Sequence, residues 1–297
     1  MMKVSRFGIW GNIDKSSFWD ILPKILIWAE KNKLSLHLTK RILNHKKADK
    51  INAQIIKSRE DFKKLDFILA LGGDGTFLSL ARAIGEKNIP ILGIHLGDLG
   101  FLAKVTVSDL FHRLNQVARG EYIVEKRLLL KTSIQSGEKL CDLFGLNDFV
   151  FTNGESHRML SASVSVDQHF VGNYKADGLI ISTPTGSTAY SLSAGGPIVT
   201  PKVDSFIITP TAAHTLTSRP LVIPSSSKVG IRFSNQNQSI HFVVDGQINK
   251  ALDPTHTVEI TKAEHKIGLI DFKDNDYFET LRTKMGWAKR GEHWYKN

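Results

Sequence analysis

The chain has 297 residues, which is enough for two domains with cores of their own, and its composition is that of a globular protein: 41% hydrophobic, 23% charged and 9% aromatic. The net charge of +10 comes from basic residues spread along the chain, without a zinc-finger or RNA-binding signature, so we expect no nucleic-acid partner. A single cysteine excludes an intrachain disulfide, and the lack of an apolar run near about 20 residues predicts a soluble, cytoplasmic protein without a membrane span.

The first third of the chain alternates between strand and helix patterns. Residues 16–31 carry apolar side chains at i, i+3 and i+4 spacing and predict an amphipathic helix, and a second helix is predicted from about residue 76 to 84. Residues 47–64 are polar and show neither a helix nor a strand pattern. Apolar runs predict strands at 4–10, 34–38, 67–71 and 89–94. This alternation predicts a parallel, Rossmann-like sheet with glycine turns at the carboxyl ends of its strands.

After about residue 121 helical periodicity nearly vanishes and short β-rich runs recur at a spacing of about ten residues, which predicts an all-β second domain. The runs are 128–134, 148–152, 161–166, 179–183, 206–209, 221–223, 229–233, 240–244, 258–260 and 266–270. From about residue 276 the pattern turns helical again. We therefore predict an α/β nucleotide-binding domain over 1–121, a β-rich domain over 122–271 and a helical tail over 272–297 that returns to the first domain.

The sequence Gly72-Gly73-Asp74-Gly75-Thr76 joins a predicted strand to a predicted helix. Such a turn presents backbone N–H groups and a positive helix end to an anion, and glycines let a ligand approach the backbone closely. A carboxylate repels phosphate, so Asp74 indicates a metal ligand or a proton acceptor for an attacking hydroxyl. The motif is neither a Walker A loop nor a dinucleotide fingerprint. The structural alternative is a tight turn with Asp74 as the helix cap.

A second stretch, residues 182–196, follows the apolar strand at 179–183 and is rich in serine, threonine, glycine and alanine. Small residues and hydroxyls suit a ribose or phosphate ligand, and Tyr190 could stack on a base. Two shorter motifs are Asn147-Asp148 and Asp245-Gly246-Gln247, each of which taken alone is better explained as a turn. Among the 11 histidines no His-Glu-x-x-His pattern occurs, so a zinc enzyme is not expected.

Together these motifs resemble those of the ATP-dependent NAD kinase family, most strongly over residues 174–198. The resemblance implies an α/β domain followed by a β domain with the active site between them, and transfer of the γ-phosphate of ATP to the 2′-hydroxyl of the adenosine ribose of NAD, giving NADP. It implies that Asp74 accepts the proton from that hydroxyl. The dinucleotide-binding residues it implies are Asp74, Gly75, Asn147, Asp148, Arg158, Lys175, Asp177, Thr188, Ala189, Tyr190, Ser191, Leu192, Ser193 and Gln247.

The resemblance also implies a divalent cation, Mg²⁺ or Mn²⁺, which enters with ATP and has no dedicated protein ligands, and a homodimer or homotetramer. Two positions depart from the family pattern: His95 stands where an asparagine is usual, and Asp98 where a basic or polar residue is usual. A lipid kinase with the same Gly-Gly-Asp-Gly motif is one alternative, although the hydroxyl-rich loop suits a polar dinucleotide better. A non-catalytic nucleotide-binding protein is the other.

Overall fold

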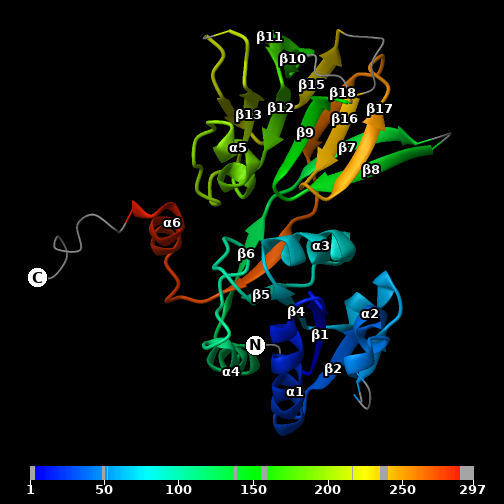
Figure 1. The fold of residues 1–297 in the computed structure, drawn as a ribbon, viewed down its shortest axis with the longest axis vertical. Coiled ribbons are helices and arrows are strands. Elements are labelled where there is room, and N and C mark those ends of the chain that lie inside the picture. The colour runs from blue at the N-terminus through cyan, green and yellow to red at the C-terminus, as the bar shows by residue number, and fades with distance from the viewer. Residues whose placement is uncertain are drawn as a thin grey trace, which may run out of the picture. The chain divides into compact units, whose positions relative to one another are not determined.

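The computed structural model describes residues 4–48, 51, 53–136, 139–154, 159–215, 217–234 and 240–287. These residues form two compact units (Figure 1), which we call unit 1 (within residues 1–126 and 267–297) and unit 2 (within residues 127–266). The β-rich domain predicted from the sequence, residues 122–271, extends beyond unit 2 at both ends. The two strands that connect the units, at 123–127 and 267–271, pair within the sheet of unit 1.

Unit 1 is built on a seven-stranded sheet in the order β3-β2-β1-β4-β5-β19-β6, parallel from β3 to β19. Its strands are β1 (Arg6–Gly11), β2 (Ser35–Thr39), β3 (Gln54–Ile56), β4 (Phe67–Gly72), β5 (Ile91–His95), β6 (Ile123–Arg127) and β19 (Ile267–Asp271). Its helices are α1 (Ser16–Lys31), α2 (Lys40–Leu43), α3 (Asp74–Ile84), α4 (Leu110–Arg119) and α6 (Tyr277–Met285), with short 3-10 turns η1 (Lys46–Ala48), η2 (Arg59–Lys64) and η3 (Gly85–Lys87).

Helices cover both faces of this sheet (Figure 1). On one face, α1 and α4 share an apolar core with alternate strand residues such as Leu69 and Leu71. The intervening Ile68 and Ala70 are equally buried but lie outside that core, on the face covered by α3. The chain moves from β1 to β2 in one direction and from β4 to β5 in the other, so the strand order reverses between β1 and β4. In such sheets this reversal opens a crevice at the carboxyl ends of the two strands.

Unit 2 consists of two six-stranded sheets, ordered β11-β10-β15-β18-β7-β8 and β14-β13-β12-β9-β16-β17, with antiparallel pairing throughout. Apolar side chains from both sheets form one core, in which Phe151 stacks on Phe242 with ring centroids 4.8 Å apart. The strands are β7 (Leu130–Ser136), β8 (Lys139–Gly145), β9 (Asp148–Asn153), β10 (Leu160–Val166), β11 (His169–Ala176), β12 (Gly178–Ser182), β13 (Ser205–Thr211), β14 (Leu221–Pro224), β15 (Val229–Phe233), β16 (Ile240–Val244), β17 (Ile248–Leu252) and β18 (Val258–Lys262).

The register of β12, β9 and β16 brings three sequence motifs to one end of their sheet. Ser182 lies opposite Asp148, and Val244 lies opposite Phe149. The hydroxyl-rich loop therefore leaves β12, and the Asp245 turn leaves β16, next to the point where β9 begins. The loop itself contains the 3-10 turn η4 (Gly186–Thr188) and the short helix α5 (Tyr190–Ser193).

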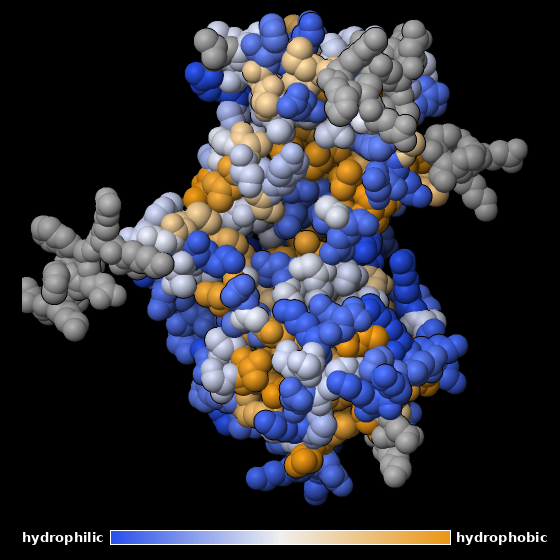
Figure 2. Space-filling model, in the orientation of Figure 1, coloured by the Kyte–Doolittle hydropathy of each residue, from blue (hydrophilic) through white to orange (hydrophobic). Residues whose placement is uncertain are grey.

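The predicted fold class, an α/β domain followed by an all-β domain, is confirmed. The helix predicted at 16–31 matches α1 residue for residue, whereas the helix expected from residue 76 begins two residues earlier, at Asp74. Sequence analysis missed α4 and the strands β3, β6, β8, β11 and β17. No helix in the described ranges is long and apolar enough to cross a membrane. In the view of Figure 2, hydrophilic residues cover most of unit 1 and apolar ones form small separate patches.

Candidate active site

The glycine-rich turn joins β4 to α3 with no space for a side chain at Gly72. β4 ends at Gly72, Gly73 is the N-cap of α3, and Asp74 is the first helical residue. A Cβ atom on Gly72 would lie 2.0 Å from the Thr76 hydroxyl, so a side chain there cannot be accommodated without displacing the first turn of the helix. The backbone N–H groups of Thr76 and Phe77 donate to the Gly73 carbonyl. Gly73, and not Asp74, occupies the cap position, so Asp74 is not the N-cap residue of the helix.

The Asp74 carboxylate is held instead by a distant loop. Three consecutive backbone N–H groups donate to it, from Phe101 to Oδ2 at 2.9 Å and from Leu102 and Ala103 to Oδ1 at 3.0 and 2.9 Å. Successive N–H groups of this kind form a concave anion-binding site. A Cβ atom on Gly100 would lie 2.0 Å from Oδ1, so the close approach of loop and carboxylate requires a glycine there. Asp74 is therefore fixed in one orientation by main-chain atoms.

The loop that holds Asp74 is itself anchored on β5. The N–H of His95 donates to the Val105 carbonyl and the N–H of Val105 to that of Gly93. A Cβ atom on Gly93 would lie 2.6 Å from the Leu102 carbonyl oxygen, so the loop rests directly on the strand. His95, the departure from the family pattern, is buried and its Nδ1 lies 2.6 Å from the Gly97 carbonyl oxygen. The histidine thus ties down the start of the same loop, whereas Asp98 is exposed.

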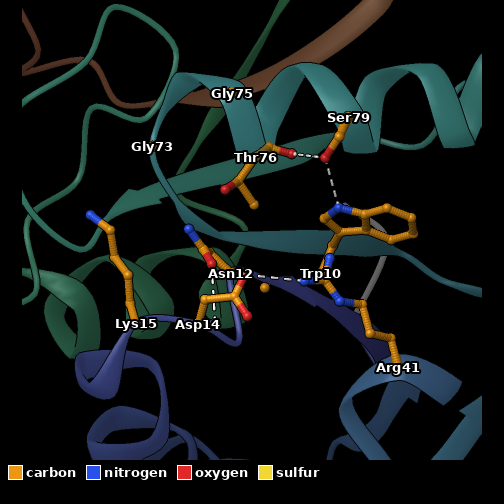
Figure 3. Close-up of a pocket in the computed structure, with 10 residues that line it drawn as sticks. Trp10, Asn12, Asp14, Lys15, Arg41, Gly73, Gly75, Thr76 and Ser79 are labelled. Carbon is orange, nitrogen blue, oxygen red and sulfur yellow. Dashed lines mark hydrogen bonds and ion pairs between the residues drawn. The ribbon is translucent and has the colours of Figure 1, made fainter. Parts of the chain in front are cut away.

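A pocket of about 430 Å³ lies where the strand order reverses, at the carboxyl ends of β1 and β4 (Figure 3). Its floor is ordered by two hydrogen bonds in series, from Trp10 Nε1 to the Ser79 hydroxyl at 2.9 Å and from that hydroxyl to the Thr76 carbonyl at 2.8 Å. The lining residues are Trp10, Gly11, Asn12, Asp14, Lys15, Arg41, Gly73, Gly75, Thr76 and Ser79. Two of them are cations, and the N-terminal turn of α3 contributes a positive helix end, so the pocket favours an anion.

In unit 2, Asn147 and Asp148 are packed against the base of the hydroxyl-rich loop. The Asn147 carbonyl accepts hydrogen bonds from the Thr183 N–H at 2.9 Å and the Ser182 hydroxyl at 3.2 Å. A Cβ atom on Gly186 would lie 2.1 Å from that carbonyl oxygen, so the loop passes against the Asn147 backbone at a distance only glycine permits. The pair is thus part of the site's framework, and more than an isolated turn.

The side chain of Asp148 is buried beside a second carboxylate, Asp245. Burial, reinforced by the negative charge of Asp245, raises the pKa of Asp148 to about 7, while a hydrogen bond from the Tyr190 N–H acts in the opposite direction. Each of these influences is a general cause of such shifts. At neutral pH this carboxyl group therefore exists in both protonation states. Asp245, which sequence analysis treated as part of a turn, is a site residue that it missed.

The side chains of the hydroxyl-rich loop divide into buried and accessible groups. Ser191 is fully buried and lies 2.9 Å from the Thr209 hydroxyl, so its side chain supports the loop. Tyr190, which is 45% exposed, and Ser193 are accessible. Thr188, Ala189 and Leu192 are half-buried, and the Thr188 hydroxyl donates to the Thr185 carbonyl at 3.3 Å.

The remaining predicted residues lie apart from this cluster. Lys175, in β11, and Asp177, just before β12, are both exposed. The hydroxyl-rich loop leaves the opposite end of β12, roughly 15 Å from the start of that strand. Gln247 is exposed in the turn after β16, next to the cluster, and its N–H donates to the Val244 carbonyl. Arg158 lies outside the described residues. Within a single chain, Asn147, Asp148, Gln247 and the hydroxyl-rich loop therefore lie at one end of the sheet. Lys175 and Asp177 lie away from that end.

The raised pKa of Asp148 predicts a specific pH dependence of stability. Because its pKa is higher in the folded than in the unfolded chain, the folded state binds more protons between about pH 4 and 7, and stability falls as the pH rises through that range. Asp148→Asn removes this cost, so the variant should melt at a higher temperature than the wild type at pH 8, by an amount equivalent to a few kcal/mol at most, and the gain should shrink toward pH 5.

Thermal melting at both pH values measures this difference. Asp142→Asn is the control, because Asp142 is exposed in the same unit and hydrogen bonds from Ser133 and Lys131 hold its pKa below the usual range. That variant should show no gain at pH 8. A melting difference between wild type and Asp148→Asn that is the same at both pH values would contradict the prediction.

Comparison with known proteins places these observations in a family. Two family models match, the ATP-NAD kinase N-terminal domain over residues 26–122 and the ATP-NAD kinase C-terminal domain over residues 146–272. An NAD kinase of Geobacter metallireducens is 36% identical over 290 residues, covering 97% of this chain and all of that protein. One of Geobacter sulfurreducens is 43% identical over 226 residues, covering 76% and 80% of the two chains.

Two solved structures are also similar. Yeast NADH kinase complexed with NADH has the same fold, with a TM-score of 0.86 at 23% identity over 100% of this chain and 91% of that one. An NAD kinase from Archaeoglobus fulgidus in complex with ATP has a TM-score of 0.72 at 25% identity, covering 95% and 98% of the two chains. The glycine-rich turn with its clamped carboxylate and the two matching domain models agree: this chain belongs to the ATP-NAD kinase family.

Proposed function

We propose that this protein is an NAD kinase that transfers the γ-phosphate of ATP to the 2′-hydroxyl of the adenosine ribose of NAD, releasing ADP and NADP. The observation that carries the proposal is Asp74, a carboxylate fixed at the first turn of a helix, between two glycines that line an anion-attracting pocket. A phosphoryl-transfer enzyme needs such a carboxylate to orient the hydroxyl nucleophile. A protein that only binds nucleotides has no use for it.

The hydrogen bonds to Asp74 favour one of its two oxygens as the proposed proton acceptor. A carboxylate offers about four lone-pair positions. Oδ1 receives two N–H donors and Oδ2 receives one, so Oδ2 retains a position for the 2′-hydroxyl. In the reaction the 2′-oxygen forms a bond to the γ-phosphorus, the bond from that phosphorus to the bridging oxygen of ADP breaks, and the hydroxyl proton passes to Asp74. Because the transition state is loose, the proton leaves late and Asp74 acts first by orientation.

The pocket beside the turn is the proposed site of the donor phosphates. Its volume of about 430 Å³ lies within the range of small-molecule sites. Figure 3 shows Lys15 and Arg41 reaching it from either side of Asn12, and the helix end of α3 faces it as well. Asp14 pairs with Arg41 and offsets part of its charge, so Lys15 and the helix end leave a net positive potential that attracts the triphosphate of ATP. Trp10, whose indole is fixed by Ser79, supplies an aromatic wall.

A divalent cation, Mg²⁺ or Mn²⁺, is proposed to arrive with ATP. The donors that the pocket offers are the Asp14 carboxylate, which pairs with Arg41 at 3.3 Å, and the Thr76 hydroxyl. This set fits a hydrated cation held mainly by phosphate oxygens, because Mg²⁺ keeps several waters and needs few protein ligands. When bound, such an ion neutralises charge on the β- and γ-phosphates. Among the described residues no group of three His, Cys, Asp or Glu side chains gathers.

Unit 2 is proposed to bind NAD. Asn147 and Asp148 supply an amide and a carboxyl group for the ribose and nicotinamide part of the dinucleotide. The exposed ring of Tyr190 is suited to stacking on a base, and Ser193 and Gln247 offer accessible polar groups beside it. Residues 188–193, which run along the same loop, would complete the lining that unit 2 provides.

The distance between Lys175 and the hydroxyl-rich loop supports an oligomer. Since Lys175, near the end of β11, and Asp177 both come before the start of β12, and the loop leaves the other end of that strand, we propose that they serve the dinucleotide site of a second copy, in a homodimer or homotetramer. Arg158, as the family resemblance implies, would add a basic contact. The single cysteine, which is exposed, fits a reducing compartment such as the cytoplasm.

The decisive test is to incubate the purified protein with ATP, Mg²⁺ and NAD and to measure NADP with an NADP-specific dehydrogenase. We expect NADP to accumulate with time and to depend on all three additions. Folded protein that yields no NADP under these conditions would refute the proposed function.

Asp74→Asn should lower kcat by about two to four orders of magnitude while NAD binding persists, because the amide is a far weaker proton acceptor. Steady-state kinetics and calorimetric NAD binding measure the two effects. Asp66→Asn is the matched control: Asp66 also accepts backbone N–H groups, from Ser5 and Arg6, but lies at the opposite end of β4. If turnover survives in Asp74→Asn, the residue positions the hydroxyl without accepting its proton.

Lys15→Ala should raise KM for ATP by about tenfold and leave KM for NAD unchanged, because the lost cation faces the donor pocket. Initial rates over a range of each substrate separate the two constants. Lys24→Ala makes the same charge change on the exposed face of α1, the helix that follows Lys15, and should alter neither constant. Equal changes in both variants would show that net charge, and not the pocket, governs ATP affinity.

A further inference from the structure

The turn between β16 and β17 contains a carboxylate in an unusual setting. Asp245 has a backbone φ of 51°, in the left-handed region, and is only 9% exposed. Hairpin turns favour Asp, Asn or Gly at such a φ, but their side chains normally face solvent. A buried aspartate needs hydrogen-bond partners to offset the loss of its hydration. The demands of the turn alone therefore do not explain why this side chain is inside the protein.

The partners of Asp245 are the backbone N–H groups of three consecutive residues. Leu146 donates to Oδ2 at 3.0 Å, and Asn147 and Asp148 donate to Oδ1 at 2.7 and 3.1 Å. In return, the Asp245 N–H donates to the Asp148 carbonyl at 3.0 Å. These residues enter β9 and carry the side chains assigned to the dinucleotide. One carboxylate thus binds the whole N–H edge of the segment that precedes the strand.

The carbonyl edge of the same segment is bound from the other side. The Thr183 hydroxyl donates to the Leu146 carbonyl at 2.6 Å, and the Thr183 N–H donates to the Asn147 carbonyl at 2.9 Å. The backbone of residues 146–148 is therefore held between Asp245 and the start of the hydroxyl-rich loop. Its conformation cannot change without breaking a bond on one edge or the other, which leaves the Asn147 and Asp148 side chains in a defined place.

We propose that Asp245 is a positioning residue of the dinucleotide site: its carboxylate binds the backbone of residues 146–148 and thereby places the side chains of Asn147 and Asp148 for NAD. This inference rests on the proposed function, to which it adds a residue that need not touch the ligand. It also explains why an aspartate, and not an asparagine, occupies this position. Three N–H donors need an acceptor with two oxygens, and an amide would turn its own NH₂ toward one of them.

Asp245→Asn tests the proposal with little change in shape, because asparagine is at least as compatible with a left-handed backbone as aspartate. We expect Kd and KM for NAD to rise about tenfold or more, since a charge-assisted network is lost. KM for ATP should change little, because the donor pocket lies in unit 1. Calorimetry with NAD alone and steady-state kinetics give the two sets of values.

The pH dependence of NAD binding supplies a readout that a purely structural role would not move. The negative charge of Asp245 is one of the causes that raise the pKa of Asp148, burial being the larger and the Tyr190 N–H opposing both. Removing the charge lowers that pKa, so the midpoint of any change in NAD affinity near pH 7 should move to lower pH in Asp245→Asn. An unchanged midpoint together with an unchanged Kd would overturn the proposal.

Two further measurements keep the outcome clear. Asp167→Asn is the matched control, because Asp167 also has a left-handed backbone (φ 49°) and accepts a backbone N–H, from Lys228, but is exposed in another turn of unit 2. It should leave Kd for NAD unchanged. If Asp245→Asn melts below the assay temperature, Asp245→Glu replaces it, keeping the charge but moving the carboxylate by one methylene, and an unchanged Kd would again overturn the proposal.

The two hypotheses fail in different ways. A wild-type protein that makes no NADP contradicts the proposed function. A wild-type protein that binds NAD and makes NADP, combined with an Asp245→Asn variant of equal NAD affinity, contradicts the positioning role of Asp245 and leaves the function intact.

Discussion

The binding of a carboxylate by consecutive backbone N–H groups is the interaction on which the active-site geometry depends. In unit 1 it joins Asp74 to residues 101–103, and through them to β5. An isolated aspartate at a helix start could adopt several rotamers, and loss of that freedom costs free energy. Here the cost is met when the protein folds, so the Asp74 carboxylate is already in place before any substrate arrives. In the proposed reaction this would be preorganisation of the base by main-chain dipoles.

The same arrangement occurs in unit 2 with the roles exchanged. There the carboxylate of Asp245 is the fixing element, and the backbone that it binds carries the functional side chains. The two carboxylates thus have similar hydrogen-bonding environments. The backbone fixes the side chain of Asp74, whereas the side chain of Asp245 fixes the backbone of residues 146–148. Burial, reinforced by the negative charge of Asp245, raises the pKa of Asp148, whose charged form is therefore disfavoured.

Much of the fold follows from local patterns in the sequence. The apolar spacing of residues 16–31 defines α1, and the apolar run before Gly72 defines β4, because each pattern is strong over its full length. α4 was missed although Leu110, Leu114 and Val117 have helical spacing, since the helix is short and half of its ten residues are polar. β19 could not be assigned to the first sheet from its own residues. Its pairing with β5 joins segments far apart in the chain, and no local signal encodes that choice.

The site could be predicted in part. Asp74, Asn147 and Asp148 were identified from their motifs, and the structure gives each a defined environment. What holds them could not be read from the sequence, because the donors to Asp74 lie 27 to 29 residues further along the chain and are backbone atoms without a side-chain signature. The sequence Asp245-Gly246-Gln247 was noticed, but it indicated a turn. Asp245 does lie in a turn, so the sequence pattern could not also reveal the positioning role that we propose for its side chain.

The main-chain character of the clamp on Asp74 affects how the enzyme can vary. Every amino acid except proline supplies the N–H groups that bind the carboxylate, so the identities of residues 101–103 are free to follow the demands of the surrounding core and of the ligand. Gly93 and Gly100 have no such freedom, since any side chain would occupy the space of the loop or of the carboxylate. Sequence divergence in this family should therefore concentrate on residues 101–103, which bind the Asp74 carboxylate. The glycines at positions 93 and 100 should be retained.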